Sequence, residues 1–149
     1  MDANAQFGSI SLEAATPALS ARDGAAMLIA RVLMAQVFIV AGTRKVLAWD
    51  ATVKYIGTHL PAPDILIYAV VLLEIGGGLL LALGWRTRQL AALLGAFTLL
   101  AALLFHQFWA APDAQFVAQL NNFMKNLAMT GGFILFMLMG GGRYSLDRR

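Results

Sequence analysis

The sequence predicts an all-α integral membrane protein, a four-helix transmembrane bundle with its N- and C-termini cytoplasmic. Of its 149 residues, 60% are hydrophobic and only 13% are charged, whereas soluble domains are nearer half apolar and a quarter charged. So short a chain cannot bury that much apolar surface within itself, because small proteins expose a large fraction of their area. In addition, four apolar segments each approach the ~20 residues that a helix needs to cross a bilayer.

The predicted spans are residues 24–47, 64–85, 89–110 and 119–140, and helix-breaking residues separate them. A soluble amphipathic helix would show a polar face, but residues 90–105 contain one hydroxyl and no charge. The breakers are Pro61 and Pro63, then Gly84, then Pro112 with Asp113. Aromatic residues favour the interface between lipid and water, and four of them fall at predicted span ends: Trp49, Trp85, Trp109 and Tyr144.

Two tails flank the predicted transmembrane domain, which comprises residues 24–142. Residues 1–23 lack the basic start of a signal peptide, so a mobile or surface-lying tail is expected there, and residues 143–149 form a basic tail. Six Lys and Arg residues lie on the side of the termini and three on the other. By the positive-inside rule, both termini face the cytoplasm of a bacterial inner membrane. The segment 52–60 is either a short surface helix or a plain loop.

Composition also excludes several kinds of chemistry. The chain has no cysteine, which excludes disulfides, thiolate nucleophiles and iron–sulfur clusters in this chain. Its basic residues are scattered singly or in twos, so no nucleic-acid partner is predicted. His59 and His106 are the two histidines, and because His59 lies in a loop, haem is not expected. We predict no metal site and no covalently bound cofactor.

Charged residues inside a span are costly and usually face the interior of the bundle. Arg31 in the first span and Glu74 in the second are expected near the middle of the membrane, where the two side chains could form an ion pair. Such a pair either fixes the helix register or tunes Glu74 as a proton acceptor. The run Gly76, Gly77 and Gly78 permits a bend or the close approach of a neighbouring helix.

A second polar layer is expected toward the outer side. Its members share a helical stripe with small residues, which places them toward a common interior: Lys45, His106, Asn122, Lys125 and Asn126. The alternative is that the Lys125 side chain extends to the interface between lipid and water, and that His106 is a polar side chain at that interface without a binding role. The candidate catalytic residues are Glu74 and His106. The candidate substrate-binding residues are Arg31, Lys45, Asn122, Lys125 and Asn126.

The ordered set of motifs resembles the DoxX family of small four-helix bacterial membrane proteins. The resemblance covers residues 25–147 and rests on the stretches RVLMAQVFIVAGTRKV, GTHLPAP, LLEIGGGLLLALGWRTR, FHQF, KNLAMTGGFILFMLMGGG and YSLD. Members of the family look like subunits or associates of membrane redox systems, and one branch resembles the membrane subunit of a thiosulfate:quinone oxidoreductase. Others are linked to thiol and oxidative-stress responses. The resemblance implies that most of the candidate residues occupy the family's polar positions: Arg31, Lys45, Glu74, His106, Lys125 and Asn126.

Three functions are consistent with these features. The first is association with quinone-linked or thiol/sulfur redox metabolism, as a membrane oxidoreductase subunit that binds a small molecule, such as a quinone, in a polar pocket between helices. His106 and Lys125 would then donate hydrogen bonds to the quinone and Glu74 would pass a proton. The second is a small-molecule transporter or binding protein. The third is a non-catalytic scaffold subunit of a larger membrane complex. The expected partners are the lipid bilayer, membrane or redox subunits, and a second copy of the chain.

Overall fold

The computed structural model describes residues 20–147, and within this range all regular structure is helical. The prediction of an all-α fold is therefore confirmed. The elements are α1 (Ala21–Leu47), α2 (Trp49–Gly57), α3 (Pro63–Val71), a π-helical turn η1 (Leu72–Gly76), α4 (Gly77–Leu83), α5 (Thr87–Phe105), a short 3-10 turn η2 (Phe108–Ala110) and α6 (Asp113–Met139). Because α3, η1 and α4 follow one another without a break, they form a single rod.

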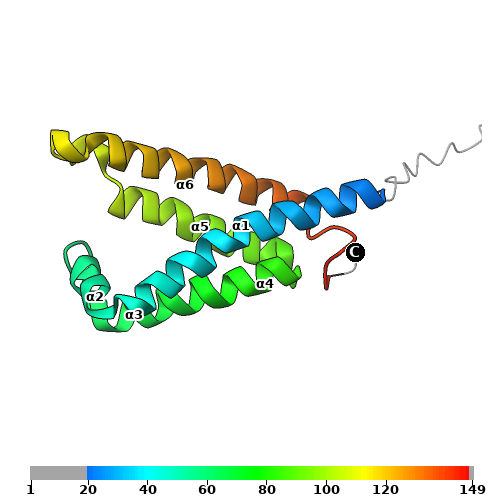
Figure 1. Ribbon diagram of the computed structural model, residues 1–149, viewed down its shortest axis with the longest axis horizontal. Helices are drawn as coiled ribbons and strands as arrows, with labels where there is room; N and C mark the ends of the chain where they lie inside the picture. The colour runs from blue at the N-terminus through cyan, green and yellow to red at the C-terminus, as the bar shows by residue number, and fades with distance from the viewer. Residues whose placement is uncertain (1–19, 148–149) are drawn as a thin grey trace, which may run out of the picture.

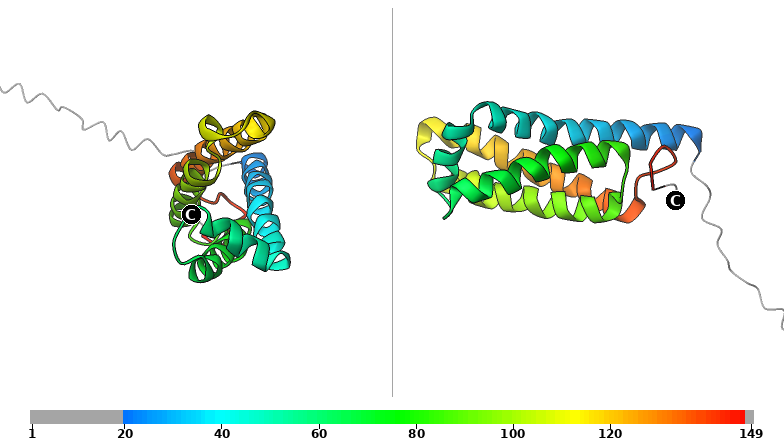
Figure 2. Two further views of the ribbon diagram at one scale, coloured as in Figure 1. Left: turned by 90° about the vertical axis from the view of Figure 1, so that its left-hand side faces the viewer. Right: turned by 90° about the horizontal axis from the view of Figure 1, so that it is seen from below.

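Four long rods make up the body of the molecule, and α2 lies at one end of it (Figure 1). The closest packing joins α5 to α6 and α1 to the α4 and η1 segments. In Figure 1 these two helix pairs lie close together at the α4 end and diverge toward the α2 end. The end-on view in Figure 2 shows the rods lying around a common axis. The molecule therefore has a closely packed end and a more open end.

Three segments of the described chain are long and apolar enough to cross a membrane: Ala21–Leu47, Pro63–Leu83 and Thr87–Ala110. They coincide, within a few residues, with the first three predicted spans. The fourth predicted span, residues 119–140, falls on α6. That helix has 27 residues, but it begins six residues earlier than predicted, and its first half carries several amides and Lys125.

The ends of the helices follow from local sequence. The Ser20 hydroxyl accepts a hydrogen bond from the Asp23 amide at 3.2 Å, and the Asp23 carboxylate accepts one from the Ser20 amide at 3.0 Å. This capping box starts α1 at Ala21, within the predicted tail, whose residues 1–19 lie outside the described range. α4 ends at Gly84, whose φ of 71° suits glycine. Residues 49–57 form the helix α2, so most of the segment 52–60 is helical rather than a plain loop.

The core lies toward the closely packed end, where α1, α4, α5 and α6 meet. Its buried apolar side chains are Ala35, Phe38, Leu81, Leu90, Ala91, Leu94, Phe133 and Phe136. The predicted close approach at the glycine run is confirmed at Gly78. A Cβ added there would lie 2.8 Å from Cγ1 of Ile39 and 3.1 Å from the carbonyl oxygen of Ala35. Small residues let the backbones of membrane helices approach in this way.

The C-terminal residues 140–147 fold back across the turn between α4 and α5, and we call them the strap. The Leu146 amide donates to the Leu83 carbonyl at 3.1 Å, and the Asp147 amide donates to the Gly84 carbonyl at 3.0 Å. The Asp147 carboxylate accepts from the backbone amides of Arg86 at 2.5 Å and Thr87 at 2.7 Å, which caps α5. The described part of the predicted C-terminal tail is therefore held against the bundle.

Candidate functional site

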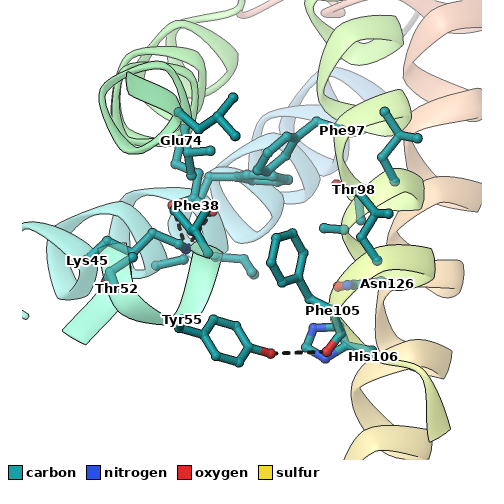
Figure 3. A pocket seen from close by; sticks show the side chains of 18 of the residues that line it. Phe38, Lys45, Thr52, Tyr55, Glu74, Phe97, Thr98, Phe105, His106 and Asn126 are labelled. Atoms are coloured by element: carbon teal, nitrogen blue, oxygen red, sulfur yellow. Dashed lines mark hydrogen bonds and ion pairs between the residues drawn. The ribbon is translucent and has the colours of Figure 1, made fainter. Parts of the chain in front are cut away.

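A cavity of about 420 Å³ lies between the helices at the open end of the bundle (Figure 3). Its walls come from α1, α2, the α3–η1 rod, α5 and α6, and most of the lining side chains are apolar or aromatic. The polar or charged residues that line it are Lys45, Thr52, Tyr55, Glu74, Thr98, His106, Lys125 and Asn126. Five of the seven candidate residues therefore line one cavity. Arg31 and Asn122 do not.

One wall carries a buried ion pair between Lys45 of α1 and Glu74 of η1. The Lys45 Nζ lies 2.8 Å from each of the two Glu74 carboxylate oxygens. The Lys45 side chain is 29% exposed and the Glu74 side chain only 6%. Gly42 allows this approach, because a Cβ added there would lie 3.1 Å from the Cβ of Glu74 and 2.6 Å from Cγ1 of Ile75.

Glu74 lies in the π-helical turn Leu72–Gly76, which interrupts the α-helical hydrogen bonding of its rod. Turns of this kind are rare and occur often at functional sites, because the extra residue redirects the side chains around it. The following glycines, Gly77 and Gly78, are buried against neighbouring helices. The glycine run permitted a bend or a close approach, and the close approach is the alternative that the structure supports.

The predicted ion pair between Arg31 and Glu74 is wrong. Arg31 is fully buried and donates from Nη1 to the carbonyl oxygens of Leu81 at 3.3 Å and Ala82 at 3.1 Å, and from Nη2 to the carbonyl oxygen of Tyr144. Seven helical residues, about 10 Å, separate Glu74 from Leu81 along the rod. Since the rods run in opposite directions, Arg31 meets the end of α4, and Lys45 meets Glu74.

Arg31 therefore belongs to the packed end of the molecule. The last carbonyls of a helix have no partner within the helix, and the Arg31 guanidinium satisfies two of them at the end of α4. Burial alone would raise the pKa of the nearby Asp147. However, the hydrogen bonds from the Thr87 and Arg86 amides and the charge of Arg31 together lower the pKa of Asp147 below its ordinary value. Arg31 thus joins the strap to α4.

The opposite wall of the cavity carries uncharged amides, an imidazole and one lysine. His106 Nδ1 lies 3.0 Å from Oε1 of Gln119, and the Lys125 Nζ donates to the Asn122 Oδ1 at 3.1 Å. Asn126 is 9% exposed. Its side-chain amide makes no hydrogen bond with any other residue of the range 20–147. Because Asn126 lines the cavity, its amide offers a donor and an acceptor to a molecule bound there.

Helix α2 lines the cavity at the open end of the bundle, which sequence analysis did not predict. Thr52, Tyr55 and Ile56 line the cavity from one face of α2. The Tyr55 hydroxyl donates to the Phe105 carbonyl oxygen at 3.2 Å, and the two rings lie 5.6 Å apart. Burial raises the pKa of Tyr55. The signal for this helix in the sequence was the recurrence of lining residues at spacings of three and four along an apolar face that begins near Trp49.

Figure 3 shows the Lys45–Glu74 pair on one side of the cavity and His106 and Asn126 on the other, with the rings of Phe38 and Phe105 between them. The cavity therefore presents polar atoms at two opposite walls and an aromatic, apolar middle. Among residues 20–147, no cluster of three His, Cys, Asp or Glu side chains is arranged to hold a metal ion. The site suits hydrogen bonding and proton transfer to an organic molecule.

Comparisons with known proteins place this arrangement in a family. The model of the DoxX family matches residues 26–107, more than half of the chain. This chain belongs to the DoxX family. The matched range contains Arg31, Lys45, Glu74 and His106, whereas Asn126 lies beyond it.

Two relatives from Escherichia coli K12 extend the similarity. The inner membrane protein YqjF is 40% identical over 122 residues, which cover 82% of this chain and 89% of the relative. The inner membrane protein YphA is 35% identical over 124 residues, which cover 83% of this chain and 89% of the relative. No solved structure matches the chain. Together with the three apolar helices, these relatives show that this DoxX protein is an inner-membrane protein.

Proposed function

We propose that this DoxX protein binds a small lipophilic molecule of the quinone type in the cavity between its helices and serves quinone-linked or thiol/sulfur redox metabolism. The observation that carries the proposal is the pair of opposed polar walls across an aromatic middle. A quinone headgroup has the complementary form, because it is a flat apolar ring with a carbonyl at each end. The cavity volume of about 420 Å³ falls in the usual range of small-molecule sites.

Each wall supplies a donor to such a headgroup. The amide of Asn126 can donate to one carbonyl, and such a hydrogen bond contributes about 0.5–1.5 kcal/mol net. Lys45 can donate to the other, because its ammonium group carries three hydrogens. The rings of Phe38 and Phe105 flank the space between. Glu74 and His106 are the groups in the cavity that can hold or release a proton beside the ligand.

The proposed place in the membrane follows from the distribution of charge. We place α6 as the fourth crossing, with its amides and Lys125 turned toward the other helices rather than toward lipid. The end with the strap carries exposed arginines, namely Arg22, Arg86, Arg88 and Arg143, which favours the cytoplasmic side. The open end with α2 then faces outward. Single cysteines introduced as Lys54→Cys and Arg88→Cys should react with an impermeant reagent from opposite sides of the membrane. Labelling of both from one side would refute this topology.

The redox role requires a partner, because the chain has no cysteine. Electrons would pass between the bound molecule and another membrane or redox subunit, and thiol chemistry would take place in that subunit. This chain would supply the binding site and the proton-carrying groups. A scaffold without a ligand is the alternative, and it predicts no binding in the cavity.

The test measures the binding of a short-chain ubiquinone to the full-length protein in nanodiscs. Binding is detected by the quenching of tryptophan fluorescence. Asn126→Leu should weaken binding about tenfold, which corresponds to the loss of one hydrogen bond of about 1.4 kcal/mol. Asn121→Leu is the matched control, since Asn121 is exposed on the same helix and does not line the cavity. Absence of binding to the parent protein, or equal binding by all three proteins, would refute the proposal.

A further inference from the structure

A second hollow adjoins the cavity at the corner between α1 and α2. It has a volume of about 340 Å³ and is lined by Ala41, Arg44, Lys45, Ala48 and Thr52. Three of these residues, Ala41, Lys45 and Thr52, also line the main cavity. They therefore form a thin partition between the cavity and the outer corner of the molecule.

Lys45 is the polar and movable part of this partition. Its Nζ touches both carboxylate oxygens of Glu74 at 2.8 Å, while 29% of its side chain remains exposed, against 6% for Glu74. A lysine side chain has four rotatable carbon–carbon bonds, so it can turn from a buried partner to water with little cost. The ion pair thus reaches from the buried carboxylate to the accessible corner.

Glu74 is the one carboxylate among the described residues that line the cavity. The other polar or charged groups of the cavity lining are Lys45 from α1, Thr52 and Tyr55 from α2, Thr98 from α5, His106 after α5, and Lys125 and Asn126 from α6. Of these, Lys45 contacts the Glu74 carboxylate and also lines the second hollow. Lys45 therefore offers a direct route for a proton between Glu74 and the corner between α1 and α2.

We infer that Glu74 and Lys45 form a proton-exchange site that opens to the aqueous phase on the α2 side through this partition. In the closed form, the carboxylate is paired with the ammonium group of Lys45. When a proton from water binds the carboxylate, the pair loses its attraction and the ammonium group turns into the hollow beside Arg44. Release of the proton reverses the movement. The inference rests on the proposed function for its purpose, because a quinone-type ligand that gains electrons also gains protons.

The experiment measures how fast Glu74 reacts with a water-soluble carbodiimide and an amine, in the full-length protein in sealed vesicles. Arg88→Cys, at the opposite end, stays protected from an impermeant reagent in the vesicles that display α2 outward and so identifies them, and peptide mass spectrometry measures the amidated fraction of Glu74. We expect labelling from the α2 side that accelerates as the pH falls, since carbodiimides react with protonated carboxyls. Lys45→Met should speed labelling at neutral pH about tenfold, because the Glu74 carboxylate then lacks the opposite charge that favours its ionised form. Lys54→Met, on the exposed helix α2, should have no effect.

Ala41→Phe tests the partition directly, because it fills the space between the hollow and the cavity. It should slow the water-soluble reagent while a lipid-soluble carbodiimide still labels Glu74, which also shows that the variant is folded. Labelling of the parent protein by the lipid-soluble reagent alone would overturn the inference, as would labelling from the opposite side. Either result would leave the proposed quinone binding through Asn126 standing. Loss of quinone binding with intact labelling would instead refute the proposed function alone.

Discussion

Replacement of Arg31 by methionine tests whether this residue holds the packed end together or belongs to the ligand site. Arg31 is fully buried and donates to three carbonyl oxygens, those of Leu81, Ala82 and Tyr144. Methionine fills a similar length of the space but removes the guanidinium donor from all three carbonyls, of which Leu81 still accepts from the Gly84 amide at 3.0 Å. It also removes a positive charge that lowers the pKa of Asp147.

The expected loss can be estimated from these contacts. Hydrogen bonds to a charged group contribute about 1.5–3 kcal/mol each, and three of them are lost. Part of this loss is offset, because the variant no longer buries a charge away from water. Single substitutions seldom cost more than about 4–5 kcal/mol. We therefore expect Arg31→Met to lower the free energy of unfolding by about 3–5 kcal/mol. Arg31→Lys should lose less stability than Arg31→Met, because it keeps the positive charge. It should still be less stable than the parent protein, because lysine lacks the planar fork of arginine.

The assay is reversible unfolding by SDS titration in mixed micelles, with tryptic cleavage after Arg143 as a local measure of strap release. Arg44→Met is the matched control, because Arg44 is exposed at the opposite end and should change stability by less than about 0.5 kcal/mol. Arg31→Met should also speed cleavage after Arg143. The reasoning fails if Arg31→Met is as stable as the control. It fails equally if the variant loses quinone binding while its unfolding and cleavage are unchanged.

Two further predictions concern the strap and the helix contacts. Asp147→Asn should destabilise the protein at neutral pH, because the folded state favours the ionised carboxylate. The difference in stability between the variant and the parent should disappear as the pH falls through the lowered pKa of Asp147. Melting temperatures measured from neutral to acidic pH test this, and a difference that stays constant with pH would contradict it. Gly78→Ala should cost about 1–3 kcal/mol, because its methyl group meets Ile39 and the Ala35 carbonyl. Gly131→Ala is the control, because a Cβ added at Gly131 meets nothing within 4 Å, and it should be neutral or stabilising. Equal effects of the two substitutions in the same SDS titration would refute the packing argument.

The sequence predicted the helices well because apolar length is a strong and local signal. The first three predicted spans agree with the structure to within a few residues, apart from the 3-10 turn that follows α5. Five of the seven candidate residues line one cavity, because helical spacing alone decides which side chains share a face. The resemblance to the DoxX family also covered the closing YSLD stretch, although its packing against α4 and α5 was not foreseen.

The pairing of the charged residues could not be predicted in the same way. Depth was estimated from predicted span ends, while the choice of partner depends on differences of about one helical turn, 5.4 Å. In the structure about 10 Å, or two turns, separates Glu74 from the Arg31 contact at Leu81, and Glu74 pairs with Lys45 instead. The π turn at Glu74 has no known composition signal in this chain, and its presence changes the direction of every side chain in it. The covering role of α2 depends on contacts with α5, such as that of Tyr55, which are distant in sequence.

The contrast between the buried Arg31 and the partly exposed Lys45 shows why function is expected at the α2 end of the bundle. Arg31 has a planar fork that matches several carbonyls at once, and all three of its acceptors belong to the backbone. Lys45 is a point charge on a flexible stem, and its acceptor is a titratable side chain at the edge of a cavity. The first arrangement fixes α4 and the strap, beside the core residues Ala35, Leu81 and Phe133. The second can change partners without disturbing that core. Ligand sites need parts that move at low cost, so the rigid end with Arg31 supports the bundle and leaves the end with Lys45 free to bind and to exchange protons.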